Sequence, residues 1–95
     1  MKVLSPHDSS GWITAIIQGR WVQAKVYDVP SMYGVNGGRV SKIVIAKTSK
    51  ENSSPEYHYD RGWEFGNLPK GVLKKVLKEL ESLPVCTYTL NNEAS

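Results

Sequence analysis

A Gln18-Gly19 pair between two apolar runs constrains this chain more than any other feature. Residues 12–17 and 20–27 lie on either side of it and alternate in the period-two manner of β-strands. A two-residue hairpin turn fixes which residues of the two strands face each other, so Ile13 is predicted to face Ala24. The resulting hairpin has two chemically different faces.

One predicted face is aliphatic and is expected to be buried. It carries Ile13, Ala15, Ile17, Val22, Ala24 and Val26. The opposite face mixes aromatic and polar side chains, which an ordinary solvated sheet does not require. It carries Trp12, Thr14, Ile16, Trp21, Gln23, Lys25 and Tyr27. We expect a partner on this second face. Internal cover by Trp63, Phe65, the Tyr33 loop or a terminal strand is an equal alternative, because large exposed apolar patches are rare on monomers.

A third strand is predicted over residues 39–47, which are rich in Val and Ile. Neither side of this segment is clearly polar, which is typical of a central strand that is covered at least in part on both sides. The long loop before it, residues 28–38, is expected to be ordered because it contains apolar side chains to bury. These are Val29, Met32, Tyr33 and Val35.

The second half of the chain predicts one helix. Residues 48–55 are expected to form a polar linker, and the aromatic segment 57–65 a short strand or a bulged pair against the sheet. A helix is predicted from Asn67 or Leu68, with Pro69 at its first position and Pro84 beyond its end. Its apolar face is expected to cover the aliphatic side of the sheet. That face carries Val72, Leu73, Val76, Leu77, Leu80 and Leu83.

These elements predict an α+β fold. An antiparallel meander of three to four strands packs on one C-terminal amphipathic helix, with a final strand over residues 85–90 left open. At 95 residues the chain supports one small domain, with an ordered core over about residues 11–90 and frayed ends. No second domain or internal repeat is predicted.

Composition limits the cellular location and the classes of partner that the sequence predicts. The single cysteine, Cys86, cannot close an internal disulfide, and the start of the chain lacks the apolar segment of a signal peptide, so a cytoplasmic location is expected. No apolar run is long enough to span a bilayer, so membrane spanning is excluded and no membrane partner is expected, while attachment to a membrane surface is left open. The net charge of +3 is compatible with an anionic partner without demanding one.

Lysines are concentrated on the predicted helix. Lys70, Lys74 and Lys78 recur at four-residue steps with Lys75 beside them, and such a stripe can follow phosphates along nucleic acid. These lysines lie near the start of the helix and repel one another, whereas Glu79 and Glu81 lie near its end, against the macrodipole. A plain solvated helix face is the more common explanation of such a pattern.

Two weaker candidates lie in loops and short strands. Residues 37–39 can present backbone N–H groups and the Arg39 guanidinium to an anion, although pairing of Arg39 with Asp28 or Asp60 is favoured. His58 and Asp60 point the same way on an extended segment and offer a base and a carboxylate. No nucleophile, metal-ligand spacing or cofactor motif accompanies them, so we expect no enzyme activity, no metal and no cofactor.

Residues 24–43 and the Tyr59-Asp-Arg-Gly-Trp63 segment resemble small uncharacterised proteins carried by phages and prophages of Gram-positive bacteria. The likeness covers about the middle half of the chain and implies a mobile-element context, with no functional residue carried over. Three antiparallel strands followed by a helix are also similar in plan to plant and integrase arm-type DNA-binding domains that read the major groove with a sheet. Their specific motifs are not matched.

The sequence therefore predicts a non-catalytic binding module of a mobile genetic element, with nucleic acid slightly favoured as ligand. The expected contacts are Trp12, Arg20, Trp21, Gln23, Lys25, Tyr27, Arg39, Lys70, Lys74, Lys75 and Lys78. The alternative is a protein-interaction module, binding a host or phage protein or a second copy of itself through the same face. A third and weaker hypothesis is a hydrolytic enzyme that uses His58 and Asp60.

Overall fold

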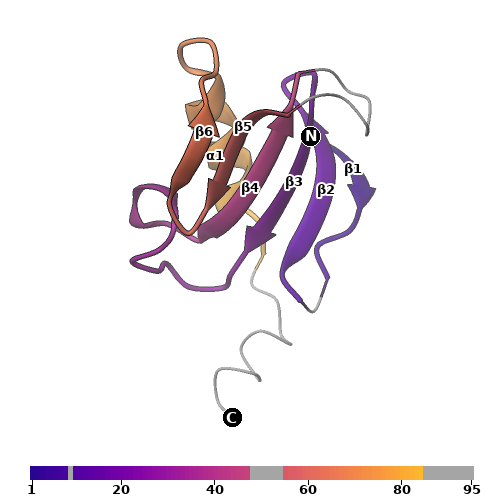
Figure 1. The fold of residues 1–95 in the computed structure, drawn as a ribbon. Coiled ribbons are helices and arrows are strands. Elements are labelled where there is room, and N and C mark those ends of the chain that lie inside the picture. Colours follow the sequence, from indigo (N-terminus) through magenta and orange to yellow (C-terminus); the bar gives the residue numbers. More distant parts are fainter. Residues whose placement is uncertain (9, 48–54, 85–95) are drawn as a thin grey trace.

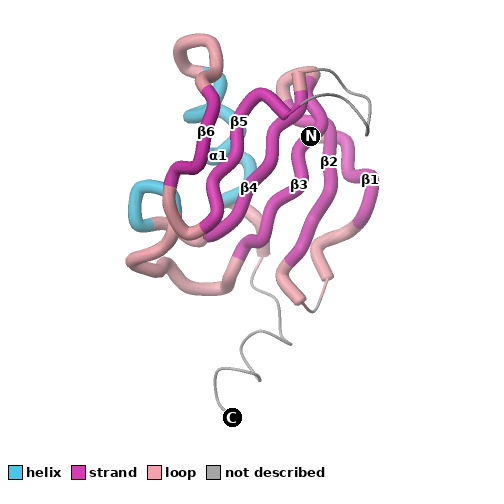
Figure 2. The backbone as a smooth tube through the Cα atoms, in the orientation of Figure 1, coloured by secondary structure: helices cyan, strands magenta, loops and turns pink. Residues whose placement is uncertain are grey.

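One antiparallel sheet and one α-helix make up the part of the protein that the structure describes. In this computed structural model, the described residues are 1–8, 10–47 and 55–84. The strands are β1 (Lys2–Ser5), β2 (Trp12–Ile17), β3 (Arg20–Val26), β4 (Val40–Ala46), β5 (Pro55–Asp60) and β6 (Trp63–Gly66). They pair in sequence order, and α1 (Val72–Glu81) lies across one face of the sheet (Figures 1 and 2). The α+β class is confirmed, but the sheet has six strands instead of three to four.

The first predicted hairpin forms in the predicted register. Gln18 and Gly19 both have positive φ, 54° and 73°, as a type I′ two-residue turn requires. Ile17 therefore pairs with Arg20, and Ile13 with Ala24. Because side chains alternate between the faces of a strand, this register alone sorts the aliphatic residues to one side of the sheet.

The core lies between that aliphatic side and α1. Every residue of the predicted aliphatic face is buried, with at most 2% of its surface exposed. Val76, Leu77 and Leu80 of α1 pack against them, with Val72, Leu73 and Leu83 partly buried around the edge. The predicted apolar face of the helix is confirmed. Each fully buried large aliphatic side chain contributes about 1.5–3 kcal/mol to stability.

The helix begins later than predicted. It starts at Val72, whereas the sequence pattern indicated Asn67 or Leu68. Gly71 has a φ of 82°, a left-handed conformation that is incompatible with helix continuation, so residues 67–70 stay outside the helix. Lys70 therefore precedes α1, and only three lysines of the predicted stripe lie within it.

The loop between β3 and β4 is held by its backbone and not by the apolar side chains that were expected to bury. Val35, in the short 3₁₀ helix η1 (Val35–Gly37), is buried, but Val29, Met32 and Tyr33 are exposed. The Ser31 N–H donates to the Gly38 carbonyl at 3.1 Å, and the Gly34 N–H donates to the Ser31 carbonyl at 2.9 Å. The prediction was wrong for these three side chains because local backbone hydrogen bonds are enough to order a glycine-rich loop.

The aromatic segment 57–65 forms the end of β5, a turn at Arg61, and β6. A register shift between His58 and Tyr59 makes it the bulged pair that the sequence indicated, and it extends the sheet by two strands. β4 is therefore a central strand, as predicted, with β3 and β5 as its neighbours. The predicted linker falls mostly on residues 48–54, and the suggested final strand and Cys86 fall on residues 85–95, all outside the described residues.

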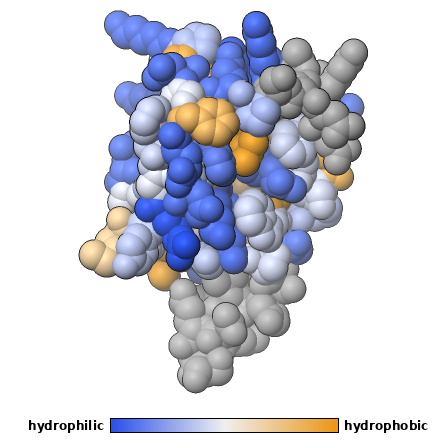
Figure 3. All heavy atoms as spheres, in the orientation of Figure 1, coloured by the Kyte–Doolittle hydropathy of each residue, from blue (hydrophilic) through white to orange (hydrophobic). Residues whose placement is uncertain are grey.

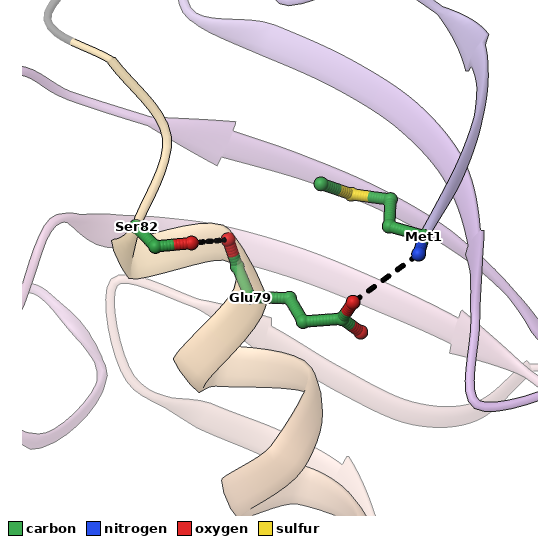
Figure 4. A network of polar contacts seen from close by, with 3 residues as sticks. All are labelled: Met1, Glu79 and Ser82. Carbon is green, nitrogen blue, oxygen red and sulfur yellow. Dashed lines mark hydrogen bonds and ion pairs between the residues drawn. The ribbon is translucent and has the colours of Figure 1, made fainter.

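β1 was not among the predicted strands. It pairs antiparallel with β2, Lys2 opposite Ile16 and Val3 opposite Ala15, and all of its residues are exposed. The Met1 ammonium reaches α1, where it lies 3.2 Å from Oε1 of Glu79 (Figure 4). The N-terminal segment is thus attached to the sheet by backbone pairing and to the helix by one ion pair. No helix among the described residues is long and apolar enough to cross a membrane.

Candidate binding face

The sheet surface opposite α1 carries the candidate site, and we call it the open face. In Figure 1 the helix lies behind the sheet, so Figure 3, in the same orientation, looks onto the open face, which is mostly hydrophilic with scattered apolar side chains. Strand register assigns to it Trp12, Thr14, Ile16, Trp21, Gln23, Lys25, Lys42, Val44, His58, Asp60 and Phe65. Apart from Phe65, these side chains are half-buried.

The structure brings four predicted contact residues together on this face. Trp21 pairs with Ile16, Gln23 with Thr14 and Lys25 with Trp12 across the first hairpin. Their half-burial comes from packing side by side along the pleated strands, so each presents one edge or end to solvent. Both indoles are therefore accessible without being fully exposed.

Internal cover by the suggested residues is not found in the described part of the chain. Trp63 is 63% exposed, and it pairs with Tyr59, whose side chain packs against the core on the helix side. Tyr33 is 55% exposed and lies in the loop after β3. Phe65 belongs to the open face, where its ring meets His58 edge-on at 5.6 Å between centroids. The suggested terminal strand lies outside the described residues.

Three charged residues form a row across the middle strands. Lys25 of β3 pairs with Lys42 of β4, and Lys42 in turn pairs with Asp60 of β5. Nζ of Lys42 lies 3.8 Å from Oδ1 of Asp60, whereas Nζ of Lys25 lies 5.4 Å from the ring centre of Tyr27. Like charges directly opposite each other destabilise a sheet, so the row leaves a local excess of positive charge on the open face.

Arg20 is engaged at the end of the same hairpin. Its Nε lies 2.8 Å from Oε1 of Glu56 on β5, and both side chains are about four-fifths buried. The pair links β3 to β5 beside the last residues of β4, because Pro55 and Tyr57 on either side of Glu56 pair with Ala46 and Ile45. A guanidinium in such a pair is largely neutralised, so Arg20 contributes to the sheet more directly than to a ligand site.

Arg39 is a structural residue, and its partners differ from those predicted. Its Nε donates to the Tyr27 carbonyl at 2.7 Å. Its Nη1 donates to the carbonyls of Glu81 and Leu83 at 2.9 and 2.6 Å. The side chain thus satisfies carbonyls at the C-terminal end of α1, where a cation is favoured by the helix dipole. Neither Asp28 nor Asp60 is among these partners.

The predicted anion cradle around residues 37–39 is filled by the protein itself. Oε2 of Glu81 accepts the backbone N–H of Arg39 at 2.8 Å and that of Val40 at 3.3 Å. A Cβ at Gly38 would overlap this carboxylate, so the close approach requires glycine. Glu81 and Arg39 together form a reciprocal latch between α1 and β4, which also explains a glutamate at the helix end.

The lysines near the helix lie on the other side of the molecule. Lys70, Lys74, Lys75 and Lys78 are all exposed, on residues that point away from the sheet that α1 covers. Lys74, Lys75 and Lys78 lie on α1, which covers the face of the sheet opposite the open face, whereas Lys70 lies in the loop between β6 and α1 (Figure 2). The expected single site is therefore divided into two surfaces.

His58 and Asp60 lie two residues apart on β5 and project onto the open face. His58 contacts Phe65, and Oδ1 of Asp60 lies 3.8 Å from Lys42 and 3.6 Å from Arg61. Among the described residues, no group of three or more His, Cys, Asp and Glu side chains is arranged to hold a metal ion. The contacts of His58 and Asp60 within the described residues therefore consist of one aromatic ring and two cations.

The displaced pKa values belong to groups outside the open face. Hydrogen bonding of Asp8 by the Ser10 side chain lowers the pKa of that carboxyl, with backbone N–H groups of Ser10 and Trp12 adding to the effect. Burial raises the pKa of Tyr57, and the neighbouring Tyr59 adds to the shift. Tyr57 belongs to the core on the helix side of the sheet.

Sequence reasoning missed part of the open face because it assigned no pairing register to the third predicted strand and predicted too few strands beyond it. Lys42 and Val44 on β4, and His58 and Phe65 beyond it, extend the face that Trp21 and Gln23 begin. The alternation of side chains along residues 40–46 was the available signal. Pairing this predicted strand with the second strand of the hairpin places Lys42 beside Lys25.

Comparison with known proteins identifies a family without an assigned activity. No curated protein and no solved structure matches the chain. A model of a domain of unknown function, DUF7678, matches residues 11–81. The match runs from the residue before β2 to the last residue of α1, and so contains both the open face and the Arg39–Glu81 latch. Because it spans well over half of the sequence, the chain belongs to the DUF7678 domain family.

Proposed function

We propose that the open face is a non-catalytic binding surface for nucleic acid, with single strands as the preferred form. The observation that carries this proposal is the grouping of two accessible indoles with Gln23 and Lys25 on a sheet face that no described segment covers. Indoles stack on unpaired bases, amides reach base edges, and lysines neutralise phosphate.

The width of the sheet favours single strands over a duplex. Neighbouring strands are about 4.8 Å apart, so three strands span about 10 Å and fit a major groove about 12 Å wide. Six strands span about 24 Å, which is too wide to lie flat in that groove. The likeness to three-stranded groove readers therefore loses its geometric basis, whereas a wide platform suits bases that are already unpaired.

The charge row adds a reason for an anionic ligand. Lys25 and Lys42 oppose each other across neighbouring strands. Of these two lysines, only Lys42 forms an ion pair among the described residues, with Asp60, and Arg61 also contacts that carboxylate. Bound phosphate would relieve this repulsion. The resemblance to phage-borne proteins supports a role in a mobile genetic element, and such a role would place the protein in the bacterial cytoplasm.

The proposal is tested by titrating a fluorescently labelled single-stranded oligonucleotide with the protein at several salt concentrations. Loss of one base stack costs about 1–3 kcal/mol, so Trp21→Ala is expected to weaken binding about 5- to 150-fold. Trp63→Ala removes an indole that is more exposed but lies on the edge strand β6, three strands away from Trp21 on β3, and it is expected to leave affinity unchanged. Equal losses in both variants, or no binding at low salt, would refute the proposal.

The second candidate function is binding of a protein partner. It is favoured by exposed apolar side chains near one end of the sheet, where the Tyr59 hydroxyl donates to the Tyr33 carbonyl at 3.0 Å. These side chains are Val29, Met32, Tyr33 and Trp63. Sedimentation of the wild type and of Trp63→Ala separates the two candidate functions. The second function is supported if the wild type self-associates, Trp63→Ala abolishes this self-association, and the wild type binds no oligonucleotide.

A further inference from the structure

The exposed lysines around α1 form a second positive surface, which we call the lysine face. It consists of Lys70, Lys74, Lys75 and Lys78. None of these four is part of an ion pair among the described residues. Lys74 and Lys78 are one turn apart, about 6 Å along the helix, so their like charges repel each other.

The two glutamates of α1 do not neutralise this face. Glu79 binds the Met1 ammonium at 3.2 Å (Figure 4), and Glu81 accepts backbone N–H groups of β4 and the residue before it. The first turn of the helix contains no acidic residue. Both acids are therefore committed to holding the fold, and the four lysines project positive charge into solvent.

We propose that the lysine face binds the phosphate backbone of a second nucleic-acid segment, so that one protein molecule bridges two segments. This inference rests on the proposed function of the open face. Lys74, Lys75 and Lys78 lie on α1, which covers the face of the sheet opposite the open face, so separate segments can occupy the two surfaces (Figure 2).

The chemistry of the lysine face favours phosphate over a lipid surface. Helices that lie on membranes insert their apolar side into the acyl region. In α1 that side is already packed in the core through Val76, Leu77 and Leu80. What remains on the surface is a set of ammonium groups, which bind phosphates as point charges and carry no base specificity.

Bridging is measured with two 15-nucleotide single strands that cannot pair, one carrying a donor dye and the other an acceptor. Wild-type protein is expected to produce energy transfer between them, and excess unlabelled strand should abolish the transfer. The quadruple variant Lys70→Gln, Lys74→Gln, Lys75→Gln and Lys78→Gln is expected to lower the apparent affinity for the second strand at least about 10-fold. The dissociation constant of this variant for a single strand, measured by fluorescence anisotropy, should stay within about threefold of the wild-type value.

The matched control replaces the same four lysines by arginine. This variant keeps the charge and is expected to keep energy transfer, and circular dichroism and thermal melting confirm that both variants fold. Salt sensitivity gives a second readout, because each lost phosphate contact on a single strand reduces the log-log salt slope of the second binding step by about 0.7.

The possible failures are distinguishable. If wild type binds one strand without energy transfer, or if the glutamine variant bridges as well as wild type, the lysine face is not a bridging surface and the open-face proposal stands. If the lysines instead govern binding to vesicles with one-third phosphatidylglycerol and have no effect on oligonucleotides, the face is a membrane-contact surface and the inference fails. Absence of binding to any single strand refutes the proposed function itself.

Discussion

The two faces of this sheet are built from the same strands and have opposite chemistry. On the helix side, Ala24, Ile43 and Ile45 are completely buried. The residues that alternate with them along the same two strands, Gln23, Lys25, Lys42 and Val44, are only half-buried. One face alone supplies the core. The open face does not have to pack against another layer, so it can carry Lys25 opposite Lys42. A sheet selected only for stability would avoid such a pair of like charges.

Adjacent residues of β4 give the sharpest contrast. Ile43→Ala is expected to destabilise the protein by about 2–5 kcal/mol, because it leaves a cavity between the sheet and α1. Val44→Ala, one residue further on the open face, is expected to cost less than about 1.5 kcal/mol. Urea unfolding followed by far-UV circular dichroism measures both. Similar losses would show that the open face is also packed as a core.

The Arg39–Glu81 latch between α1 and β4 allows a second comparison, between a structural arginine and an exposed one. Arg39→Met removes the donors for the carbonyls of Tyr27, Glu81 and Leu83 and is expected to cost about 1.5–3 kcal/mol. Arg61→Met removes an arginine whose side chain is 67% exposed and should cost less than about 0.5 kcal/mol. The affinity of folded Arg39→Met for the oligonucleotide should equal that of the wild type. A loss of affinity comparable to that of Trp21→Ala would show that Arg39 belongs to the binding site.

The turn that fixes both faces offers a stabilising change. Gln18 has a φ of 54°, which is unfavourable for a residue other than glycine, asparagine or aspartate. Gln18→Asn is expected to stabilise the protein by about 0.5–1 kcal/mol because asparagine tolerates this conformation in type I′ turns. The midpoint of urea unfolding should rise without a change in slope. A lower midpoint would contradict the turn type.

The smallest expected effect is a pH dependence confined to the helix side. Because burial raises the pKa of Tyr57, the folded protein holds the phenol proton more tightly than the unfolded chain. Its contribution to stability is complete below the unfolded pKa of about 10 and is lost as the pH rises through the folded value. Tyr57→Phe is expected to show a smaller loss of stability than wild type between about pH 9 and 11, measured by urea unfolding. Parallel curves would contradict the shift.

The parts of the fold that were predictable are those set by local periodicity. Gln18-Gly19 fixed the hairpin register, and the three-and-four spacing of Val76, Leu77 and Leu80 identified the buried side of the helix. β1 was not predictable in this way, because all of its residues are exposed and no alternation of burial marks its sequence.

The candidate site was predictable only where it lies on the first hairpin. Trp21, Gln23 and Lys25 follow from the register, but the role of Arg39 depends on Glu81, which lies 42 residues away. A contact between residues so far apart in the sequence cannot be recognised from the spacing of neighbouring residues. Arg39, which follows two glycines, was therefore interpreted as part of an anion site. The division of lysines and indoles between two sides of the molecule also required knowing which face α1 covers.

The central claim, that the open face is the binding surface, is tested most directly by the indole N–H resonances of the three tryptophans in a ¹H–¹⁵N NMR titration. Trp12 and Trp21 lie on the open face, and Trp63 lies opposite Tyr59 on the edge strand β6. On addition of single-stranded oligonucleotide, the resonances of Trp12 and Trp21 are expected to shift while that of Trp63 stays in place. A shift of Trp63 alone, or no shift at saturating oligonucleotide, would contradict the account.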